Sequence, residues 1–418
     1  MPGEKSLELG KRLAGVECRN TTFLSGDWPI FWERAEGVNV WDADGNRFLD
    51  MTSGFGVAGE GYGFTGEALR RQSATLMHAM GDVHPARVKV ELCEALSEMT
   101  FEKWEGRKGK CLFGNSGFEA VEAALKTAVV ATGRSGILSF EGGYHGLGYG
   151  ALLGAGIGWF REPFDGQLAR VTERLYFPKN SEDMEVFRKQ LAQVDGSGIG
   201  AVLVEPIQGR GGIHVPPEGF LKALRAWCNE VGAVLVFDEI YTGFWRSGKM
   251  FACEWEGVVP DLICLGKALS GGFPISVCVG KAEVMDRWPV SGGEALHTST
   301  FLGNPMGCAM GMEALRRYRQ AEIENMVTEA GERLGQALDP LLELGFVTEI
   351  RGRGLMLGIQ ADSGERVIDV VKRMLRAGVI ALPDGPSGDV LALTPPFSVT
   401  ADEIDFSVES VKAALLGV

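Results

Sequence analysis

The sequence lacks several features that would mark a class of protein at once. Basic residues are not in excess: 41 Lys and Arg stand against 55 Asp and Glu, so the formal net charge of the 418 residues is −14. An acidic chain is a poor binder of nucleic-acid phosphates. No apolar run approaches the roughly 20 residues that span a membrane, and no apolar signal segment follows Met1. We therefore expect a cytoplasmic protein that binds neither nucleic acid nor membranes.

Ligand patterns for metals and nucleotides are also missing. The eight cysteines are scattered without a C-x-x-C pair, and the five histidines form no zinc pattern. Several cysteines, such as Cys264 and Cys278, lie inside apolar runs, which is typical of reduced thiols in a protein core. A phosphate-binding G-x-x-x-x-G-K-[ST] loop is absent, because Ala268 follows Gly266-Lys267. We therefore expect no bound metal.

The middle of the chain indicates the fold class. From about residue 65 to residue 305, short Val/Ile/Leu runs alternate with helical patterns, which is typical of a mostly parallel sheet flanked by helices on both faces. We predict this α/β fold for a large domain over residues 65–305. The expected strands are 112–113, 137–140, 201–204, 234–237, 262–265 and 275–279, and the expected helices are 119–130 and 219–231.

The two ends of the chain have a different pattern. After residue 305, long helices and short strands predict a smaller α+β domain over residues 306–418. The expected helices are 306–319, 322–344, 365–377 and one from 401, and the expected strands are 347–350, 355–359, 379–380 and 390–393. Near the start, residues 38–41 and 47–50 flank Asp44-Gly45 and predict a β-hairpin. We expect this N-terminal segment, residues 1–64, to pack with the small domain.

Two motifs follow the first expected strands, at the sheet edge where open α/β sheets bind ligands. Ser116 and Gly117 open a helix, and the free backbone N–H groups of a helix N-terminus suit a phosphate. In the next glycine-rich turn, Tyr144 stands beside His145. Taken alone, the first motif is a weak signal because Ser and Gly are also ordinary helix caps, and the second is more typical of a packed turn.

Two further motifs follow neighbouring strands. Asp238 and Glu239 end the strand at 234–237, where two carboxylates are costly unless a positive group lies near them. Lys267 follows the strand at 262–265, where partial burial would lower the pKa of its amine and make it nucleophilic. A phosphate site, an aromatic ring, an acid and a lysine together match what pyridoxal phosphate requires.

A competing motif indicates a dinucleotide-dependent oxidoreductase. Gly54–Gly59 formally satisfies G-x-G-x-x-G after an apolar stretch. The helix that should begin there is not predicted, because residues 60–63 continue the glycine-rich loop. The dinucleotide interpretation is therefore the weaker hypothesis.

Taken in order, the motifs make the sequence recognisable. From about residue 28 to its end it resembles the class III aminotransferases, pyridoxal-phosphate enzymes of fold type I. The resemblance rests on Asn115–Ala120, Tyr144–Gly146, Glu205–Gly209, Asp238–Ile240, Gly266-Lys267, His297–Phe301 with Gly303–Pro305, and Arg351-Gly352. It implies an enzyme that moves an amino group from an amino acid or amine to an oxo acid, such as pyruvate or 2-oxoglutarate, in two half-reactions.

The resemblance also implies roles around the cofactor, pyridoxal 5′-phosphate. Lys267 would hold it as a Schiff base and later move a proton, and Asp238 would pair with its pyridine nitrogen. Tyr144 and Ile240 would cover the two faces of its ring. The other implied cofactor-binding residues are Ser116, Gly117 and Phe118 at the phosphate, Thr300 at the phosphate of the neighbouring subunit, His145 and Glu205. Because Thr300 would reach across subunits, the resemblance implies a homodimer with its active sites at the interface.

Substrate recognition is where the sequence departs from the family. Arg351 resembles the arginine that binds the substrate α-carboxylate. Arg210 stands where relatives acting on ornithine or 4-aminobutyrate carry a glutamate that neutralises this arginine. Two arginines facing one pocket would favour an acidic substrate. The alternative is that Arg210 turns into solvent or pairs with an acidic residue elsewhere. The other departures are Phe118 in place of a small residue, Leu147 in place of arginine and Tyr241 in place of glutamine.

Some alternatives use the same scaffold. An aminomutase or an amino-acid epimerase would need the same cofactor, and the sequence leaves these two open. A catalytically silent binding protein conflicts with the presence of Lys267 and Asp238.

Overall fold

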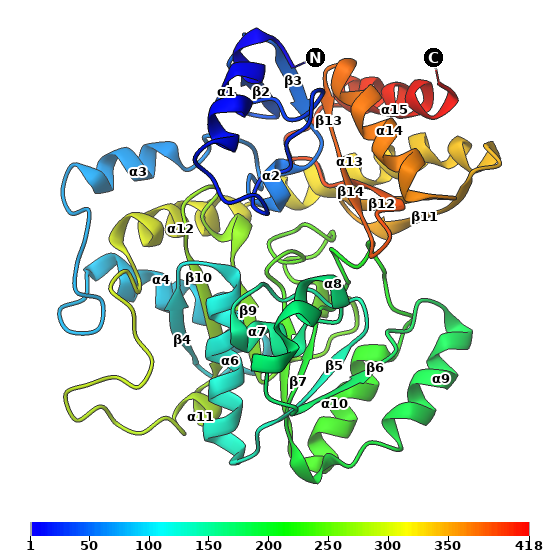
Figure 1. Cartoon of the computed structure of the whole chain (residues 1–418). Coiled ribbons are helices and arrows are strands. Elements are labelled where there is room, and N and C mark those ends of the chain that lie inside the picture. The colour runs from blue at the N-terminus through cyan, green and yellow to red at the C-terminus, as the bar shows by residue number, and fades with distance from the viewer. Residues whose placement is uncertain (1, 418) are drawn as a thin grey trace.

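The computed structural model describes residues 2–417, and its centre is a seven-stranded, mostly parallel sheet (Figure 1). In spatial order the strands are β4 (Gly109–Gly114), β10 (Ser276–Lys281), β9 (Leu262–Leu265), β8 (Val234–Asp238), β7 (Ile199–Val204), β5 (Gly136–Phe140) and β6 (Thr172–Leu175). β10 runs antiparallel to both of its neighbours, whereas the other strands share one direction. The carboxyl ends of β5, β7, β8 and β9 therefore meet at one edge of the sheet.

Alternate side chains of these strands face two helical layers, which explains why the strands are continuous apolar runs. Ala201 and Leu203 pack with α6 (Gly117–Thr132) on one face. Val202 and Val204 belong to the larger core on the other face, together with α9 (Ser181–Leu191) and α10 (Phe220–Val231). The sheet is thus buried on both sides and forms a rigid base for its carboxyl edge.

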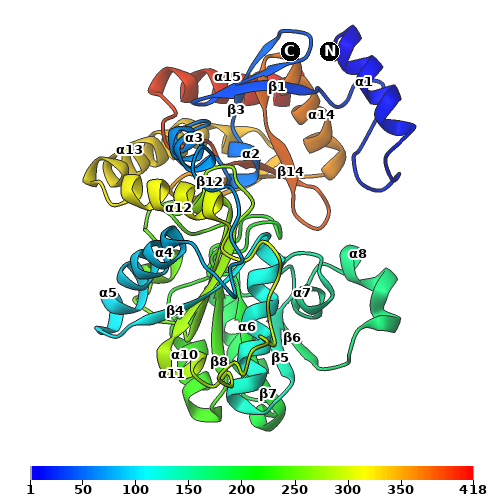
Figure 2. The same ribbon diagram turned by 90° about the vertical axis from the view of Figure 1, so that its left-hand side faces the viewer.

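Other helices surround this layer and connect it to the rest of the chain. They are α3 (Gly66–Ser73), α4 (Arg87–Ser97), α5 (Lys103–Glu105), α7 (Tyr149–Gly154), α8 (Gly158–Arg161), α11 (Ala282–Met285) and α12 (Pro305–Tyr318). In Figure 2, α12 lies between the central sheet and the upper part of the molecule.

Two four-stranded sheets lie above the carboxyl edge of the central sheet in Figures 1 and 2. The first contains β1 (Trp32–Glu36), β2 (Asn39–Asp42), β3 (Arg47–Asp50) and β13 (Val379–Ile380); the second has the order β11 (Val347–Arg353), β12 (Met356–Ala361), β15 (Val390–Leu393) and β14 (Leu382–Asp384). The accompanying helices are α1 (Glu4–Ala14), α2 (Ser53–Gly56), α13 (Ala321–Leu338), α14 (Gly364–Arg376) and α15 (Ala401–Leu416). The parallel pair of β3 and β13 joins the two ends of the chain in one sheet.

The predicted α/β core is confirmed, and the predicted hairpin is the antiparallel pair of β2 and β3. Three strands were not predicted. β1 is a mostly exposed edge strand that carries the charged residues Glu33, Arg34 and Glu36. β6 is an edge strand that carries the polar residues Thr172, Glu173 and Arg174, and β14 has three residues that include a proline, so neither forms an apolar run. The helix expected at 322–344 ends at Leu338, and a 3-10 turn with proline in its first positions follows.

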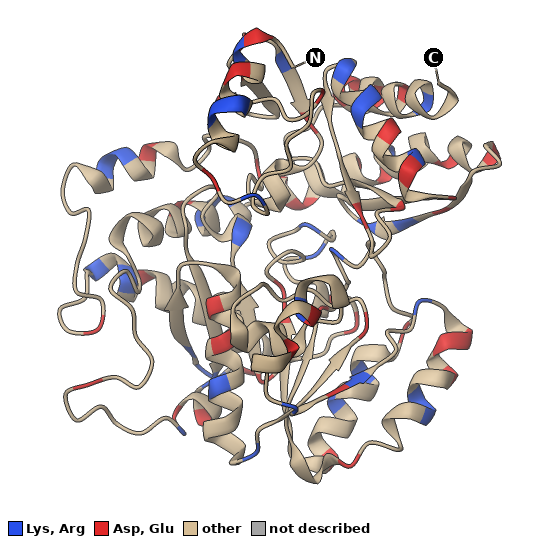
Figure 3. Cartoon of the chain, in the orientation of Figure 1, with Lys and Arg blue, Asp and Glu red and all other residues tan. Residues whose placement is uncertain are grey.

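The surface carries charges of both signs. Acidic and basic residues both occur on surface helices such as α14 (Figure 3), where Arg373 pairs with Asp369 and Arg366 pairs with Asp362 just before the helix. Within residues 2–417, no helix is both long and apolar enough to cross a membrane.

Candidate active site

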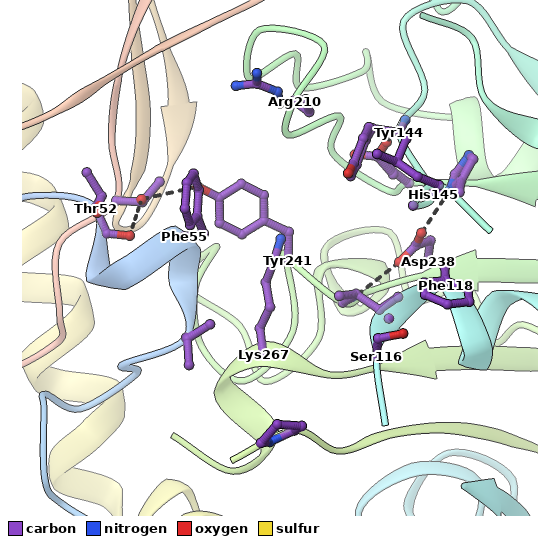
Figure 4. Close-up of a pocket in the computed structure, with 18 of the residues that line it drawn as sticks. Thr52, Phe55, Ser116, Phe118, Tyr144, His145, Arg210, Asp238, Tyr241 and Lys267 are labelled. Atoms are coloured by element: carbon purple, nitrogen blue, oxygen red, sulfur yellow. Dashed lines mark hydrogen bonds and ion pairs between the residues drawn. The ribbon is translucent and has the colours of Figure 1, made fainter. Parts of the chain in front are cut away.

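A cavity of about 800 Å³ lies at the carboxyl edge of the central sheet (Figure 4). One wall comes from the loops after β4, β5, β7, β8 and β9, and the opposite wall comes from residues 52–57 and 382–394. The cavity therefore forms when both ends of the chain fold onto the sheet. The sequence-predicted residues that line it are Ser116, Gly117, Phe118, Tyr144, His145, Glu205, Arg210, Asp238, Ile240 and Lys267.

Lys267 stands on a strained backbone just after β9. Its φ is +47°, a left-handed conformation that costs about 1–2 kcal/mol for a residue with a Cβ. Burial lowers the pKa of its amine to about 8, although the carboxylates of Asp238, Glu205 and Asp384 oppose this shift. A lysine with this pKa is partly unprotonated near neutral pH, so Lys267 can act as a nucleophile.

Asp238 ends β8 and forms a buried pair with His145, whose Nδ1 lies 2.8 Å from the carboxylate Oδ2. The backbone N–H of Ile240 donates to the other oxygen, Oδ1, at 3.1 Å. Burial alone would lower the pKa of His145, but the hydrogen bond to Asp238 and the charge of that carboxylate raise it above its ordinary value. His145 therefore orients the Asp238 carboxylate, which is a fixed partner for a cationic nitrogen in the cavity.

The two carboxylates nearest to Asp238 have different contacts. Glu205 accepts the backbone N–H of Tyr144 at 2.7 Å and that of Gly209 at 2.8 Å. It therefore connects the loop after β5 to the loop after β7. Burial raises the pKa of Glu205 to about 7, although the charge of His145 opposes this. Glu239 instead accepts two backbone N–H groups of residues 252–253 and does not line the cavity. Of the two adjacent acids, Asp238 is therefore the one that faces the cavity.

The N-terminus of α6 opens into the cavity. A Cβ added to Gly117 would lie 3.1 Å from Cδ1 of Ile240, so glycine lets the helix end approach this side chain closely. The Oγ of Ser116 is buried and has no hydrogen-bond partner among the residues that the structure describes. A buried hydroxyl beside the first N–H groups of a helix is suited to bind a phosphate.

Arg210 lines the cavity on the loop after β7 and pairs with Asp384 of β14. Its Nη1 lies 2.7 Å from Oδ1 of Asp384 and also donates to the carbonyl of Pro383 at 3.2 Å. Burial raises the pKa of Asp384 to about 6, although Arg210 and Lys267 oppose this shift. The Arg210 side chain is 45% exposed and that of Asp384 is 7% exposed. The arginine can therefore move out of the pair more easily than the aspartate.

Arg351 and Thr300 do not line the cavity in this structure. The guanidinium of Arg351 donates to the carbonyls of Gly212 at 2.6 Å and Ile213 at 3.1 Å. This differs from our expectation of two arginines in one pocket, because the loop after Arg210 provides backbone acceptors for Arg351. Thr300 is exposed in the segment before α12.

None of residues 52–57 was predicted to bind the pyridoxal cofactor or the substrate. Ser53, Gly54, Phe55 and Gly56 have φ values of +49°, +54°, +64° and +77°, so α2 is a left-handed turn. Asp50 holds this turn by accepting the backbone N–H of Gly54 at 2.9 Å. The side chain of Phe55 is 63% exposed and lines the cavity. The glycine pattern that suggested a dinucleotide loop is thus explained by a left-handed turn.

A partly buried lysine, a carboxylate held by hydrogen bonds and the N-terminus of a helix meet at the edge of a parallel sheet. Together they define the site of a pyridoxal-phosphate enzyme. The chain belongs to the class-III aminotransferases, because this family matches residues 24–415. The acetylornithine aminotransferase of Methanopyrus kandleri is 35% identical over 392 residues, which cover 93% of this chain and 95% of the relative. The 4-aminobutyrate aminotransferase of Mycobacterium leprae is 33% identical, with 100% of this chain and 97% of the relative covered.

The chain also resembles solved structures of aminotransferases. An aminotransferase from Bacillus anthracis has a TM-score of 0.90 and 26% identity, with 100% of both chains covered. An amine transaminase from an uncultivated Pseudomonas species has a TM-score of 0.88 and 28% identity, with 96% of this chain and 98% of that chain covered. The protein is therefore a pyridoxal-phosphate-dependent aminotransferase of fold type I, and these comparisons do not support an aminomutase, an epimerase or a dinucleotide enzyme.

Proposed function

We propose that Nζ of Lys267 binds pyridoxal 5′-phosphate as a Schiff base and, once released, carries a proton to and from the substrate carbon. The observation that carries this proposal is that the buried amine of Lys267 and the carboxylate of Asp238 line one cavity. When bound, the cofactor supplies a reactive carbonyl carbon and a ring that withdraws electrons. Asp238 holds the proton on the ring nitrogen, while Tyr144 and Ile240 pack on the two ring faces.

The phosphate end of the cofactor has its own residues. The unpartnered Oγ of Ser116 and the N–H groups of Gly117 and Phe118 bind the phosphate at the start of α6. Glu205 keeps the loop that carries Tyr144 in place through its hydrogen bond to the backbone.

Reduction with borohydride followed by peptide mass mapping tests this assignment. We expect one modified peptide, with the cofactor fixed on Lys267. Lys126→Ala is a matched control, because Lys126 is exposed on α6 outside the cavity; it should keep the modification, whereas Lys267→Ala should lose it. A cofactor fixed on another lysine in the unmodified protein would contradict the proposal.

We also infer the substrate class: oxo acids and amino acids whose carboxylate binds Arg210 after this arginine has left Asp384. Nη1 of Arg210 makes the hydrogen bonds to Pro383 and Asp384. Once this pair opens, the planar guanidinium can bind a substrate carboxylate through two nitrogens. Three other residues that line the same cavity, Phe55, Leu147 and Phe160, are apolar. They favour a substrate with an apolar body beside its carboxylate.

Kinetics with charged and uncharged substrates test the role of Arg210. We expect Arg210→Met to raise the KM for pyruvate and 2-oxoglutarate about 10- to 100-fold, the cost of losing a charge-assisted hydrogen bond. The KM for 1-phenylethylamine, which has no carboxylate, should change little. Arg351→Met is the matched control and should affect the acids less than Arg210→Met. Equal effects of Arg210→Met on acids and amine would contradict this substrate class.

We propose that the enzyme is a homodimer in which Thr300 completes the phosphate site of the partner. Two segments expose apolar side chains: Leu76, Met77, Met80 and Val83 between α3 and α4, and Leu296 and Phe301 before α12. They lie together, because Asn304 donates to the carbonyl of Met77 at 3.2 Å and Thr298 donates to Asp82 at 2.6 Å. An exposed apolar face of this kind is typical of a protein interface.

Sedimentation and cofactor binding test the dimer. We expect Met80→Glu to give monomers and Thr300→Ala to give dimers that bind the cofactor more weakly. A wild-type protein that sediments as a monomer would contradict the dimer.

All eight cysteines are free, which supports a reducing compartment such as the cytoplasm.

A further inference from the structure

Tyr241 lies against Lys267 in the cavity. Nζ of Lys267 is 3.7 Å from the centre of the Tyr241 ring and stands over its face (Figure 4). An ammonium group over an aromatic face is attracted by the ring, and the attraction grows where water is excluded. Burial raises the pKa of Tyr241 to about 12, so near neutral pH its phenol stays protonated. The contact is therefore between the amine and a neutral ring, and Tyr241 is not a general base.

The backbone around Tyr241 is built to hold the ring in this position. A Cβ added to Gly56 would lie 2.5 Å from Cε2 of the ring, and a Cβ added to Gly209 would lie 2.4 Å from Cδ1. Both distances are too short for non-bonded carbon atoms, so glycine at these two positions makes room for the ring. The Oη of Tyr241 lies 3.2 Å from Oγ1 of Thr394, which fixes the far end of the side chain.

The fixed ring face of Tyr241 matters for Lys267 when its amine is free. Its long side chain is free to rotate whenever Nζ is not linked to the cofactor. Proton transfer depends on holding the donor within hydrogen-bond reach of the reacting atom. A fixed ring face beside Nζ limits the positions that the free amine can take.

We propose that Tyr241 is a positioning residue for Lys267: its ring face holds Nζ at the cavity wall and favours the protonated form of this nitrogen. The inference rests on the proposed role of Lys267 as the cofactor-binding lysine. The ring, rather than the hydroxyl, is the active part of the side chain, because the hydroxyl is turned toward Thr394.

A spectroscopic titration of the holoenzyme tests the proposal without turnover. The absorbance of the cofactor bound to Lys267 reports the protonation of the linking nitrogen. The ring stabilises the protonated nitrogen, so removal of the ring should lower the midpoint of this titration by about 0.5–1.5 pH units. Tyr241→Leu and Tyr241→Gln both remove the ring. Tyr241→Phe keeps it and should stay within about 0.3 unit of the wild type.

Steady-state kinetics give a second readout. In the two ring-free variants we expect kcat to fall about tenfold because the free amine is less well placed, with little change in KM. Tyr241→Phe should retain most of kcat. This pattern separates positioning from a structural role, which would change cofactor retention and KM together.

Three results would overturn the inference. They are an unchanged midpoint in a ring-free variant that still binds the cofactor, a shift in Tyr241→Phe as large as in Tyr241→Leu, and an unchanged kcat in both ring-free variants. If Tyr241→Leu does not fold, Tyr241→Gln decides. Failure of the proposed function has a different signature, because the wild-type protein would then show no cofactor bound to Lys267.

Discussion

The two walls of the cavity differ in how they are held. On the sheet side, Lys267, Asp238 and Ser116 lie at the ends of β9, β8 and α6, which are regular elements in a core buried on both faces. On the opposite side, the left-handed turn α2 and the three-residue strand β14 carry Phe55 and Asp384. Regular secondary structure thus positions the lysine, the aspartate and the serine, whereas irregular backbone forms the opposite side of the space for the substrate.

The irregular wall depends on side chains that bond to its backbone. Arg246 is fully buried and donates to the carbonyls of Leu355 at 3.0 Å and Pro395 at 2.6 Å. Its Nη2 also donates to Oγ of Ser53 at 3.1 Å, and Ser53 in turn donates to the carbonyl of Thr394 at 2.5 Å. Because these contacts connect residues far apart in sequence, the wall has no local sequence signature.

The strongest test of the sheet-side wall is Lys267→Ala. We expect a folded protein whose turnover falls about 10⁴-fold or more, because both the covalent link and the proton carrier are lost. Residues 52–57 and 382–394 should keep their conformation, so the thermal unfolding midpoint of the cofactor-free variant should not fall below that of the cofactor-free wild type. Near-normal turnover would show that the chemistry is not carried by Lys267.

The second largest effect is expected for Asp238→Asn. Asparagine has nearly the same shape but cannot stabilise a cationic ring nitrogen, so the half-reaction with an amino donor should slow by on the order of 100- to 1,000-fold. Stopped-flow absorbance measures this step directly. The adjacent Glu239→Gln is the matched control, because Glu239 bonds to backbone N–H groups away from the cavity. Similar rate losses in both variants would mean that the position of the carboxylate does not matter.

The same contrast explains what the sequence can predict. Lys267 and Asp238 are predictable, because apolar runs locate β9 and β8 and the next residue must lie at the ligand edge of a parallel sheet. Arg351 is not, because whether its guanidinium faces the cavity or the carbonyl of Gly212 depends on a loop far away in sequence. Asp384 gives no signal either, since it lies in a short strand after a proline.

A pair of Ser→Ala substitutions compares the two walls, because each substitution removes one hydroxyl group. Ser116→Ala removes an unpartnered hydroxyl on the sheet side and should weaken cofactor binding about 10- to 30-fold, with little change in the substrate KM. Ser53→Ala removes the partner of Arg246 and should leave cofactor affinity unchanged, while it destabilises the fold by about 1–3 kcal/mol. Cofactor titration and thermal unfolding of both variants measure these effects. If Ser116→Ala destabilised the fold and Ser53→Ala weakened cofactor binding, the two walls would not differ in the way described.

The smallest expected effect concerns the pH dependence of acid binding. Burial raises the pKa of Asp384 to about 6 even though Arg210 and Lys267 oppose it. If a substrate carboxylate separates Arg210 from Asp384, the pKa of Asp384 rises further, because the buried Asp384 carboxylate loses its cationic partner. Below pH 6 Asp384 is protonated with or without the ligand, so affinity should be constant there. Above pH 6 binding requires uptake of a proton, so affinity should fall as pH rises.

Glutarate, an unreactive dicarboxylate, is the probe for this linkage. We expect its Kd to rise by up to about tenfold between pH 6 and pH 8, which is the change that a rise of about one pH unit in the pKa of Asp384 on binding produces. In Asp384→Asn the side chain cannot titrate, so the Kd should be nearly independent of pH and close to the wild-type value at pH 6. A Kd that rises equally in the variant and the wild type would assign the titration to another group, such as Lys267. It would also mean that a substrate carboxylate binds without separating Arg210 from Asp384.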